Sequence, residues 1–400
     1  MILVEKHLVR NSEMCKEIDN LMWLSKNLYN LTLYHIRQHY FNTNKWLTYK
    51  ETYYLLRETD AYRALPDKVS KGTLKQLYDN LSAFFKALKA WKKNPSSFKG
   101  RPKLLKYLDK EKGRFIVSYD KEALNHKSYK KDGQIMLSKT DIWIKPQAKL
   151  KSIKQVTLTK NNSSYSINIS YEKIEPVKSL QQEKKHASID LGIGNIVSLC
   201  FEHTDQPIVY NGKVLKSINQ GWNKRVSNHQ SKLSKGVFIS KRIKLETDKR
   251  NRRVSDYLHK LSADIVNQLV SKNVTNLIIG YNQGWKQDIN IGKVNNQKFV
   301  NIPYLKLIQM LNYKCLLKGI TVTTTEESYT SKCSFIDNEP MKKQIKYMGN
   351  RKHRGLFVAS NGIKINADVN GGYNIMRKVV PDFKYEQGIV ALNVLRIKIS

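Results

Sequence analysis

Residues 186–200, HASIDLGIGNIVSLC, decide the fold of the C-terminal half of this 400-residue chain. The apolar residues on either side of Gly192 and Gly194 predict two strands joined by a tight turn. Glycines at such a turn allow another stretch of backbone to approach closely. Asp190 belongs to this strand–turn–strand, so an acidic side chain lies beside a point of close backbone approach.

Strands and helices alternate along the chain from this stretch onward. The periodicity predicts strands at 206–212, 276–280 and 320–327, and helices at 249–273, 302–319 and 366–380. Gly319 is the expected C-terminal stop of the second of these helices. Because this alternation is typical of a sheet covered by helices, we predict an α/β domain.

A second acidic residue stands at the start of the last predicted helix. Asp368 precedes Asn370, Gly371 and Gly372. Taken singly, Asp190 fits a polar residue at a strand edge, and Asp368 fits a helix N-cap. However, an RNase-H-like fold builds a two-metal site from one carboxylate on a central strand and another at a helix start. On a strongly basic chain the pair favours a metal-dependent nuclease.

The charge balance indicates a polyanionic partner. The chain has 71 Lys and Arg against 33 Asp and Glu, a net charge of +38. Such a surface repels itself unless a polyanion neutralises it, and phosphate backbones do so with release of counterions. Residues 86–115 are densely basic with interleaved Phe98, Tyr107 and Phe115, which favours a nucleic-acid contact over a solvated loop. A ribosomal or chromatin-like binding protein without chemistry fits the same composition.

The sequence contains neither a disulfide framework nor a membrane segment. Its four cysteines form no CxxC pair. The first ten residues, MILVEKHLVR, predict a strand and not a signal peptide. No apolar run approaches the ~18 residues of a membrane span. We therefore expect a cytoplasmic protein with no membrane partner.

The N-terminal half predicts helices inserted into a β structure. Residues 1–10 predict a strand, and leucines at helical spacing from about residue 14 predict a long amphipathic helix. A second helix ends at Asn94-Pro95. Residues 115–178 predict strands, including a hairpin that turns at Asn161-Asn162. Together these elements predict a small barrel or sheet that contains a helical insertion.

The sequence resembles the TnpB family, the group ancestral to type V CRISPR effectors, and its eukaryotic relatives, the Fanzors. The resemblance spans nearly the whole chain. SIDLGIGNIVSL (188–199) matches the first RuvC motif, and INADVNGGYNI (365–375) matches the third. The most specific segments are YTSKCS (329–334) and ADVNGGYNI. Other matching segments are SSFKGRPK (96–103), RVSDYLHKLSADIV (253–266) and NNQKFVNIPYLKLIQML (295–311).

The sequence departs from the family pattern at the second RuvC strand. Most TnpB proteins end this strand with glutamate, whereas here it ends at Gly280. In Fanzors and a subset of TnpB proteins, a glutamate just before the Tyr-Thr-Ser segment substitutes for it, and Glu327 stands there. Gly280 leaves room for that carboxylate. Glu326 is the competitor, but neighbouring strand residues point to opposite faces, and Glu327 matches the family's E-x-Y-T-S spacing. A solvated strand end at both glutamates is the alternative.

A second departure concerns zinc. The family usually places two CxxC pairs between the Tyr-Thr-Ser segment and the third RuvC motif, whereas here Cys333 stands alone. His353 does not complete the four ligands of a structural zinc. We expect an insertion at 333–366 without zinc, whose basic run at 342–354 contacts nucleic acid. The residues predicted to pack it are Phe335, Met341, Tyr347, Leu356 and Phe357.

The resemblance implies an RNA-guided endonuclease that cleaves double-stranded DNA. We expect it to be associated with the nucleoid of a prokaryotic cell. Asp190, Glu327 and Asp368 would hold two Mg²⁺ ions, with Mn²⁺ as the alternative metal, for phosphodiester hydrolysis. The guide (omega) RNA would come from the transposon's own end, with one protein per RNA. The N-terminal half would read a short motif beside the target. A nuclease-inactive RNA-guided repressor is one alternative, favoured by Gly280. A transposase or a guide-independent DNA-binding accessory is the weakest alternative, because this sequence has no helix-turn-helix signal.

The predicted architecture is an α+β multidomain protein. It consists of a wedge-like β-barrel with an inserted helical recognition unit, followed by an RNase-H-like (RuvC) α/β nuclease domain. The predicted bounds are 1–10 and 112–178 for the barrel, 11–111 for the helical unit, 179–332 and 367–380 for the nuclease domain, 333–366 for the insertion, and 381–400 for a C-terminal tail.

Overall fold

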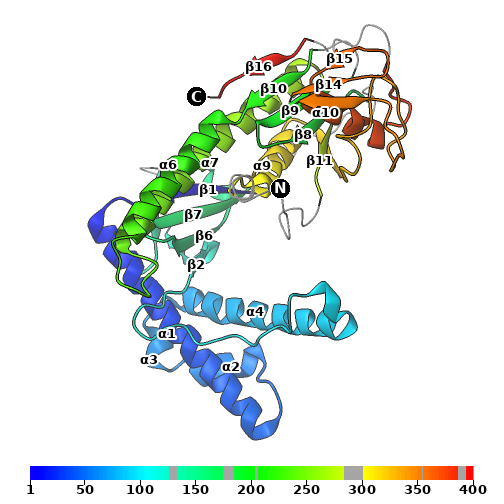
Figure 1. Cartoon of the computed structure of the whole chain (residues 1–400). Coiled ribbons are helices and arrows are strands. Elements are labelled where there is room, and N and C mark those ends of the chain that lie inside the picture. Colours follow the sequence, from blue (N-terminus) through cyan, green and yellow to red (C-terminus); the bar gives the residue numbers. More distant parts are fainter. Residues whose placement is uncertain are drawn as a thin grey trace. The chain divides into compact units, whose positions relative to one another are not determined.

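The computed structural model describes residues 1–125, 133–173, 184–202, 206–282, 301–353, 355–385 and 393–399. The chain divides into two compact units, Met1–Ile174 and Glu175–Ser400 (Figure 1). Among the described helices, none combines the length and the apolar character that crossing a bilayer requires. The polar linker predicted at 175–185 and the start of the 295–311 segment lie outside the described residues, except for Lys184 and Lys185.

The first unit places its helices between its first and second strands. The helices are α1 (Ser12–Thr43), α2 (Tyr49–Leu56), α3 (Asp60–Arg63) and α4 (Asp67–Lys93), with 3-10 turns at Pro95–Ser97, Lys121–Ala123 and Leu150–Ser152. The strands are β1 (Ile2–Leu8), β2 (Val117–Asp120), β3 (Leu124–Asn125), β4 (Ile135–Leu137), β5 (Trp143–Ile144), β6 (Ile153–Lys160) and β7 (Tyr165–Glu172). The helical segment is therefore inserted into a β structure, as the periodicity predicts.

The strands of this unit form two sheets, so the described residues do not confirm the barrel that the sequence predicts. One antiparallel sheet has the order β1-β7-β6-β2, and the other has the order β3-β4-β5. Within the described residues, β1 and β2 do not pair, so the four-stranded sheet stays open. Val156 and Ile169 of one sheet and Ile135 and Ile144 of the other enter one apolar core, which α1 and α4 share. Burial of this core holds the sheets together without the hydrogen bonds that would close a barrel.

The second unit contains a six-stranded sheet and a three-stranded sheet. Its strands are β8 (His186–Leu191), β9 (Asn195–Phe201), β10 (Ile208–Asn211), β11 (Asn276–Gly280), β12 (Thr321–Thr325), β13 (Asn350–His353), β14 (Leu356–Val358), β15 (Lys364–Ile365) and β16 (Leu395–Ile397). Its helices are α6 (Lys213–Gln230), α7 (Lys241–Ser271), α9 (Tyr304–Leu316) and α10 (Ala367–Val379). The larger sheet has the order β12-β11-β8-β9-β10-β16, and β13-β14-β15 form the smaller one.

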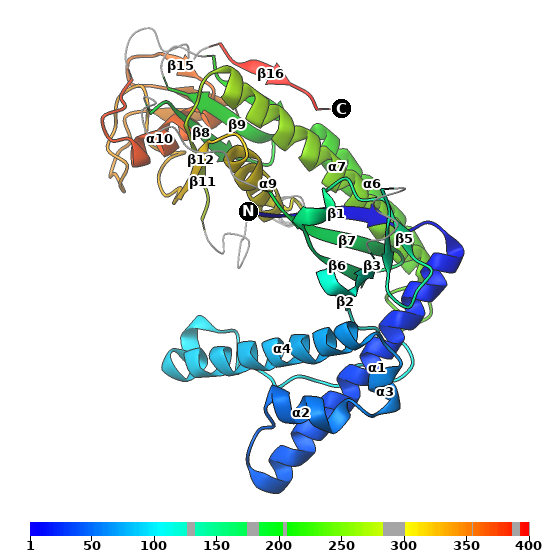
Figure 2. The same ribbon diagram turned by 180° about the vertical axis from the view of Figure 1, so that it is seen from behind.

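Side chains alternate along β8, so the two faces of the larger sheet pack against different helices. Ala187, Ile189 and Leu191 enter a core that also contains the buried residues of α7 and α9. Ser188 faces the other way, and its hydroxyl donates to the Gly372 carbonyl of α10 at 2.6 Å. Asp190 follows Ser188 on this second face, which α10 covers (Figure 2). The strand period thus places one acidic side chain between the sheet and the last helix.

Three local features differ from the sequence prediction. Residues 213–230 form α6, whose interior Gly221 and few apolar residues weaken the helical signal. Leu395–Ile397, in the segment predicted as a tail, form β16 and pair in parallel with β10. The strand predicted to reach Glu327 ends at Thr325, so Glu326 and Glu327 both lie just beyond it. The strand prediction at 276–280 is confirmed residue for residue.

Candidate active site

Asp190 lies near the end of β8, in the middle of the larger sheet. β8 pairs in parallel with β11 up to Ile279 opposite Ile189, so Gly280 and Asp190 each follow that last pair. The helix α10 approaches the carboxylate closely at Gly371. A Cβ atom at position 371 would lie 2.8 Å from Oδ2 of Asp190, so only glycine leaves the carboxylate in place.

Glu327 directs its side chain into the space beside Gly280. A Cβ atom at position 280 would lie 2.6 Å from Oε1 and 2.9 Å from Cγ of Glu327. The backbone N–H of Glu327 donates to Oδ1 of Asn282 at 2.8 Å, which fixes the chain after β12. The Glu327 carboxylate therefore occupies the place where a side chain at 280 would begin. Room for this carboxylate at Gly280 is what the sequence predicts.

Glu326 points away from this site. Its carboxylate is exposed and forms an ion pair with Nζ of Lys378 at 2.9 Å. It also accepts the Ser328 backbone N–H at 2.9 Å. The bond from Lys378 lowers the pKa of the Glu326 carboxyl. The two neighbouring glutamates thus have different surroundings, one facing Gly280 and the other facing solvent.

Asp368 lies in the first turn of α10, but it does not cap the helix. Asn366 is the N-cap, and its side chain accepts the N–H groups of Asp368 at 3.0 Å and Val369 at 3.3 Å. Oδ2 of Asp368 accepts Nδ2 of Asn195 at 2.8 Å, and Oδ1 lies 3.3 Å from Nη2 of Arg351. The alternative role of helix cap is therefore filled by Asn366, which leaves the Asp368 carboxylate available for other contacts.

The three carboxylates interact electrostatically. Burial raises the pKa of the Asp190 carboxyl well above its ordinary value, and the charges of Glu327 and Asp368 raise it further, against the opposing charge of Arg351. Burial also raises the pKa of Glu327 to about 7, with a further contribution from Glu326. Adjacent carboxylates that cost free energy when ionised are stabilised by a nearby cation.

The donor atoms suit a hard divalent cation, although they do not form a closed cage. Oε1 of Glu327 is buried and has no hydrogen-bond partner among the described residues. Such an atom costs free energy unless a ligand or ion satisfies it. In the described part of the chain, however, no three Asp, Glu, His or Cys side chains converge closely enough to hold one ion. Asp368 is held instead by Asn195 and Arg351.

Two residues of this site are missed by the sequence analysis. Asn195 begins β9 directly after the glycine turn, inside the quoted GIGN segment, and its polar character at a strand start was the available signal. Arg351 lies on β13, within the basic run at 342–354. Nothing in that run distinguishes Arg351 from its basic neighbours, because only the fold brings it to Asp368.

The insertion after Cys333 is pinned by a buried carboxylate. Glu339 accepts the Ser334 N–H at 2.7 Å and the Met348 N–H at 3.0 Å. The Cys333 thiol is buried and lies 3.5 Å from the Pro340 carbonyl. Of the predicted packing residues, Phe335 and Phe357 are fully buried, and the other three are partly exposed. The expected absence of zinc stays a prediction.

Two family models match parts of the chain, mostly in the second unit. Residues 168–286 match the model described as a probable transposase, OrfB_IS605, and residues 304–375 match the Cas12f1-like TNB domain. Over these residues the chain is similar to the TnpB family. Asp190 lies within the first match, and Asp368 lies within the second.

Two known relatives are distant from this chain in sequence. A TnpB-like protein, ORF457 of Acidianus two-tailed virus, is 26% identical over 219 residues, which are 51% of this chain and 44% of that protein. The CRISPR-associated endodeoxyribonuclease Cas12f2 of Micrarchaeota archaeon (strain CG1_02_47_40) is 24% identical over 237 residues, 56% of this chain and 42% of that protein. The chain thus spans less than half the length of these relatives.

Solved structures align over most of the chain with low scores. A chain of a cryo-EM structure of a Cas12f1–sgRNA–target DNA complex aligns over 94% of this chain and 98% of its own length, at 16% identity and a TM-score of 0.39. A score of this size carries no argument about function.

Proposed function

We propose that the chain is an RNA-guided DNA endonuclease that cleaves double-stranded DNA beside a short adjacent motif. The observation that carries the proposal is the Glu327 carboxylate in the space left by Gly280, next to the strand end that bears Asp190. In this proposal, Glu327 would supply the acidic residue that β11 lacks at Gly280. Similarity to the TnpB family and to a CRISPR-associated endodeoxyribonuclease supports the same activity.

Asp190, Glu327 and Asp368 are the residues that would hold the catalytic metal, Mg²⁺ or Mn²⁺. Bound divalent ions supply an activated water and stabilise the leaving oxygen of a phosphodiester. The chain itself contributes orientation and charge. Asn195 fixes the Asp368 carboxylate, and the Arg351 guanidinium beside it can bind a non-bridging phosphate oxygen. Gly371 keeps α10 close to Asp190.

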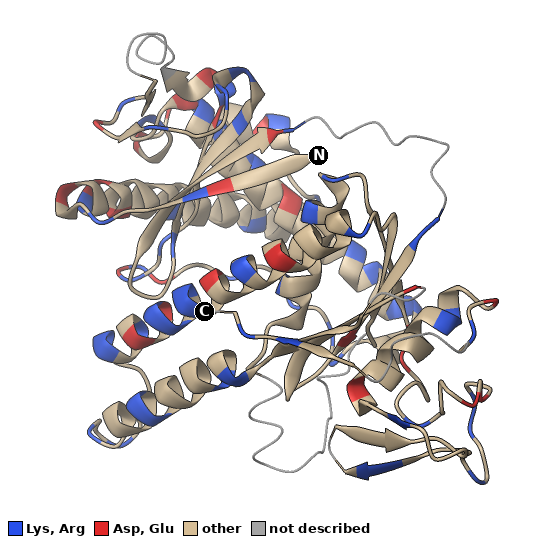
Figure 3. Ribbon diagram, turned by 90° about the horizontal axis from the view of Figure 1, so that it is seen from above, with Lys and Arg blue, Asp and Glu red and all other residues tan. Residues whose placement is uncertain are grey.

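The charge of the chain supports nucleic-acid partners for both units. Lys and Arg occur along the described helices, strands and loops of both units (Figure 3). We infer that a guide RNA derived from the transposon end and the target duplex bind to these basic segments, with the first unit reading the adjacent motif and the 333–366 insertion contacting nucleic acid. Base pairing with the guide would then supply sequence specificity.

The alternative function, a nuclease-inactive repressor, rests on Gly280 alone. The side chain that Gly280 lacks is replaced in space by Glu327. A plasmid-cleavage assay decides between the two functions. The protein, purified with its RNA and supplied with Mg²⁺, should linearise a plasmid that carries the matching target, and excess EDTA should stop cleavage but not binding. Binding without cleavage under all metal conditions would establish the repressor instead.

Removal of the Asn195 amide should weaken the site without removing a metal ligand. We expect Asn195→Ala to lower the cleavage rate by roughly 10- to 100-fold, because partners that orient metal ligands have effects of this size. The Mg²⁺ concentration for half-maximal rate should rise as well, since Asp368 loses a 2.8 Å hydrogen bond. A slower enzyme with an unchanged Mg²⁺ dependence would show that Asn195 does not position Asp368.

Binding of the RNA should depend steeply on salt. Each neutralised phosphate releases counterions, so a protein with several phosphate contacts loses roughly 10³-fold or more in affinity between about 50 and 200 mM salt. Filter binding of the co-purified RNA across that range measures the slope. A flat response would argue against a polyanionic partner for this +38 chain.

A further inference from the structure

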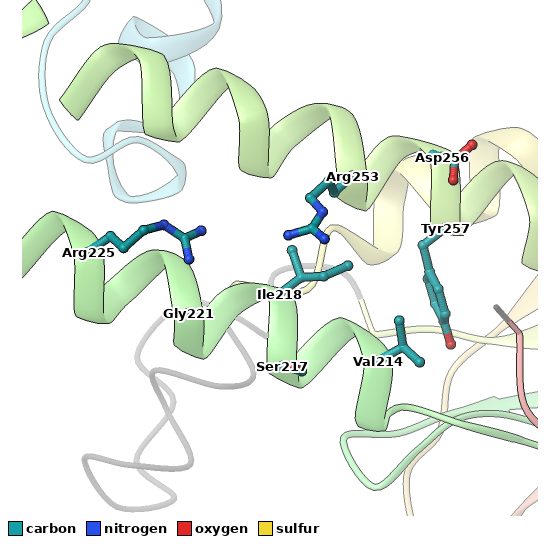
Figure 4. A pocket seen from close by; sticks show the side chains of 8 residues that line it. All are labelled: Val214, Ser217, Ile218, Gly221, Arg225, Arg253, Asp256 and Tyr257. Atoms are coloured by element: carbon teal, nitrogen blue, oxygen red, sulfur yellow. The ribbon is translucent and has the colours of Figure 1, made fainter. Parts of the chain in front are cut away.

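A polar groove lies between α6 and α7, away from the carboxylate site. Its volume is about 480 Å³, and none of its lining residues belongs to the candidate active site. Val214 and Ile218 of α6 and the ring of Tyr257 of α7 form an apolar floor (Figure 4). The Tyr257 hydroxyl donates to the Asn211 carbonyl at 3.0 Å, which leaves only its ring as a surface for a ligand.

Two arginines face the groove from opposite helices. Arg225 of α6 and Arg253 of α7 both extend their guanidinium groups into the space between the helices (Figure 4). Nε of Arg225 donates to Oε2 of Glu246 at 2.7 Å, so the side chain is oriented. Its two terminal nitrogens make no hydrogen bond to any residue that the structure describes. Among the described residues, none forms an ion pair with Arg253.

The surrounding charge favours an anionic ligand. α6 and α7 together carry twelve Lys and Arg against four Asp and Glu. The one carboxylate that lines the groove, Asp256, lies 3.3 Å from Nζ of Lys260. Guanidinium groups bind phosphate through two parallel hydrogen bonds, and an apolar floor strengthens such bonds by excluding water. Two arginines above an apolar floor match a phosphate with its attached sugar.

We propose that this groove binds one phosphodiester of a nucleic-acid backbone, gripped by Arg225 and Arg253, with the sugar against Ile218 and Tyr257. The proposal deepens the proposed function, since it names where the second unit holds the backbone of its guide RNA or target DNA. A short span of backbone held here is anchored to the α6–α7 pair by a contact that does not depend on base sequence.

The test measures binding to RNA and to DNA separately, in EDTA, with full-length protein. The probes are the RNA that co-purifies with the parent protein and a DNA duplex of the same length. Arg253→Gln and Arg225→Gln each remove one groove guanidinium. Ser217→Trp fills the groove from an exposed position without changing charge. Arg252→Gln is the matched control, because Arg252 is an exposed neighbour that does not line the groove.

Arg253→Gln and Arg225→Gln should each weaken one probe roughly tenfold, as expected for a lost hydrogen bond to a charged group. Ser217→Trp should weaken binding of the same probe because its side chain fills the groove. The two arginine variants should also lower the slope of log affinity against log salt by about one. Arg252→Gln should change affinity less. A loss of affinity for the RNA alone would show that the groove binds the guide. A loss of affinity for the duplex alone would show that it binds the target. Parental affinity of Arg253→Gln and Ser217→Trp for both probes would overturn the proposal, whether or not the parent cleaves DNA.

Discussion

Glu327→Ala should lower DNA cleavage by more than about 100-fold, because loss of a direct metal ligand exceeds the 10- to 100-fold cost of losing a residue that only orients one. The expectation rests on geometry. Glu327 is the carboxylate that reaches the space beside Gly280, at the end of the strand next to Asp190. Cleavage of a target plasmid by the protein–RNA complex, measured at saturating Mg²⁺, gives the effect. Asp190→Ala should show a loss of similar size.

Glu326→Ala is the matched control for this result. Glu326 is exposed and bound to Lys378, so its removal should leave most of the activity. Thermal melting in EDTA separates catalysis from folding. Oε1 of Glu327 is buried and has no hydrogen-bond partner in the part of the chain that the structure describes, so Glu327→Ala should melt no lower than the parent. A dead Glu326→Ala beside an active Glu327→Ala would show that the other glutamate is the ligand.

The sequence predicts those parts of the fold that depend on local periodicity. The strand at 276–280 and the helix that follows Asn366 could be read from apolar spacing and a polar cap. β16 could not, because three residues carry little pattern and the strand exists only through pairing with β10. The predicted barrel is not confirmed in detail, for a related reason. Alternation shows that a strand has a buried face, but it does not show whether two sheets share a core or close on each other.

In the candidate site, too, the sequence indicates only those residues that a local motif marks. Asp190 and Asp368 stand in segments whose glycines and spacing mark them, and Glu327 is marked by its distance from the Tyr-Thr-Ser segment. Arg351 is contributed by a strand of the smaller sheet, and its contact with Asp368 follows from tertiary structure alone.

A side chain at position 280 should compete directly with Glu327. The Cβ of Gly280→Ala would lie within 2.6 Å of Oε1 of Glu327 and 2.5 Å of Cδ1 of Ile375. Both are the far ends of flexible side chains, so the backbone can survive at an overpacking cost of about 1–3 kcal/mol. The Glu327 carboxylate, however, must leave its place. We expect Gly280→Ala to remain folded by thermal melting and to cleave at least ~10-fold more slowly than the parent, the lower end of the effects measured around metal ligands.

The same competition predicts a rescue. In Glu327→Ala the space beside Gly280 is vacant, and a glutamate introduced at position 280 starts from the backbone next to Asp190. The double variant Gly280→Glu/Glu327→Ala should therefore recover at least ~10-fold of the activity lost in Glu327→Ala, since it restores a carboxylate to the site. Gly280→Glu alone should be slower than the double variant, because two acidic side chains then share one space and repel each other. Plasmid cleavage by all four proteins, in a double-mutant cycle, gives the coupling between the two positions. Simple additivity would mean that Glu327 acts elsewhere than at the position opened by Gly280.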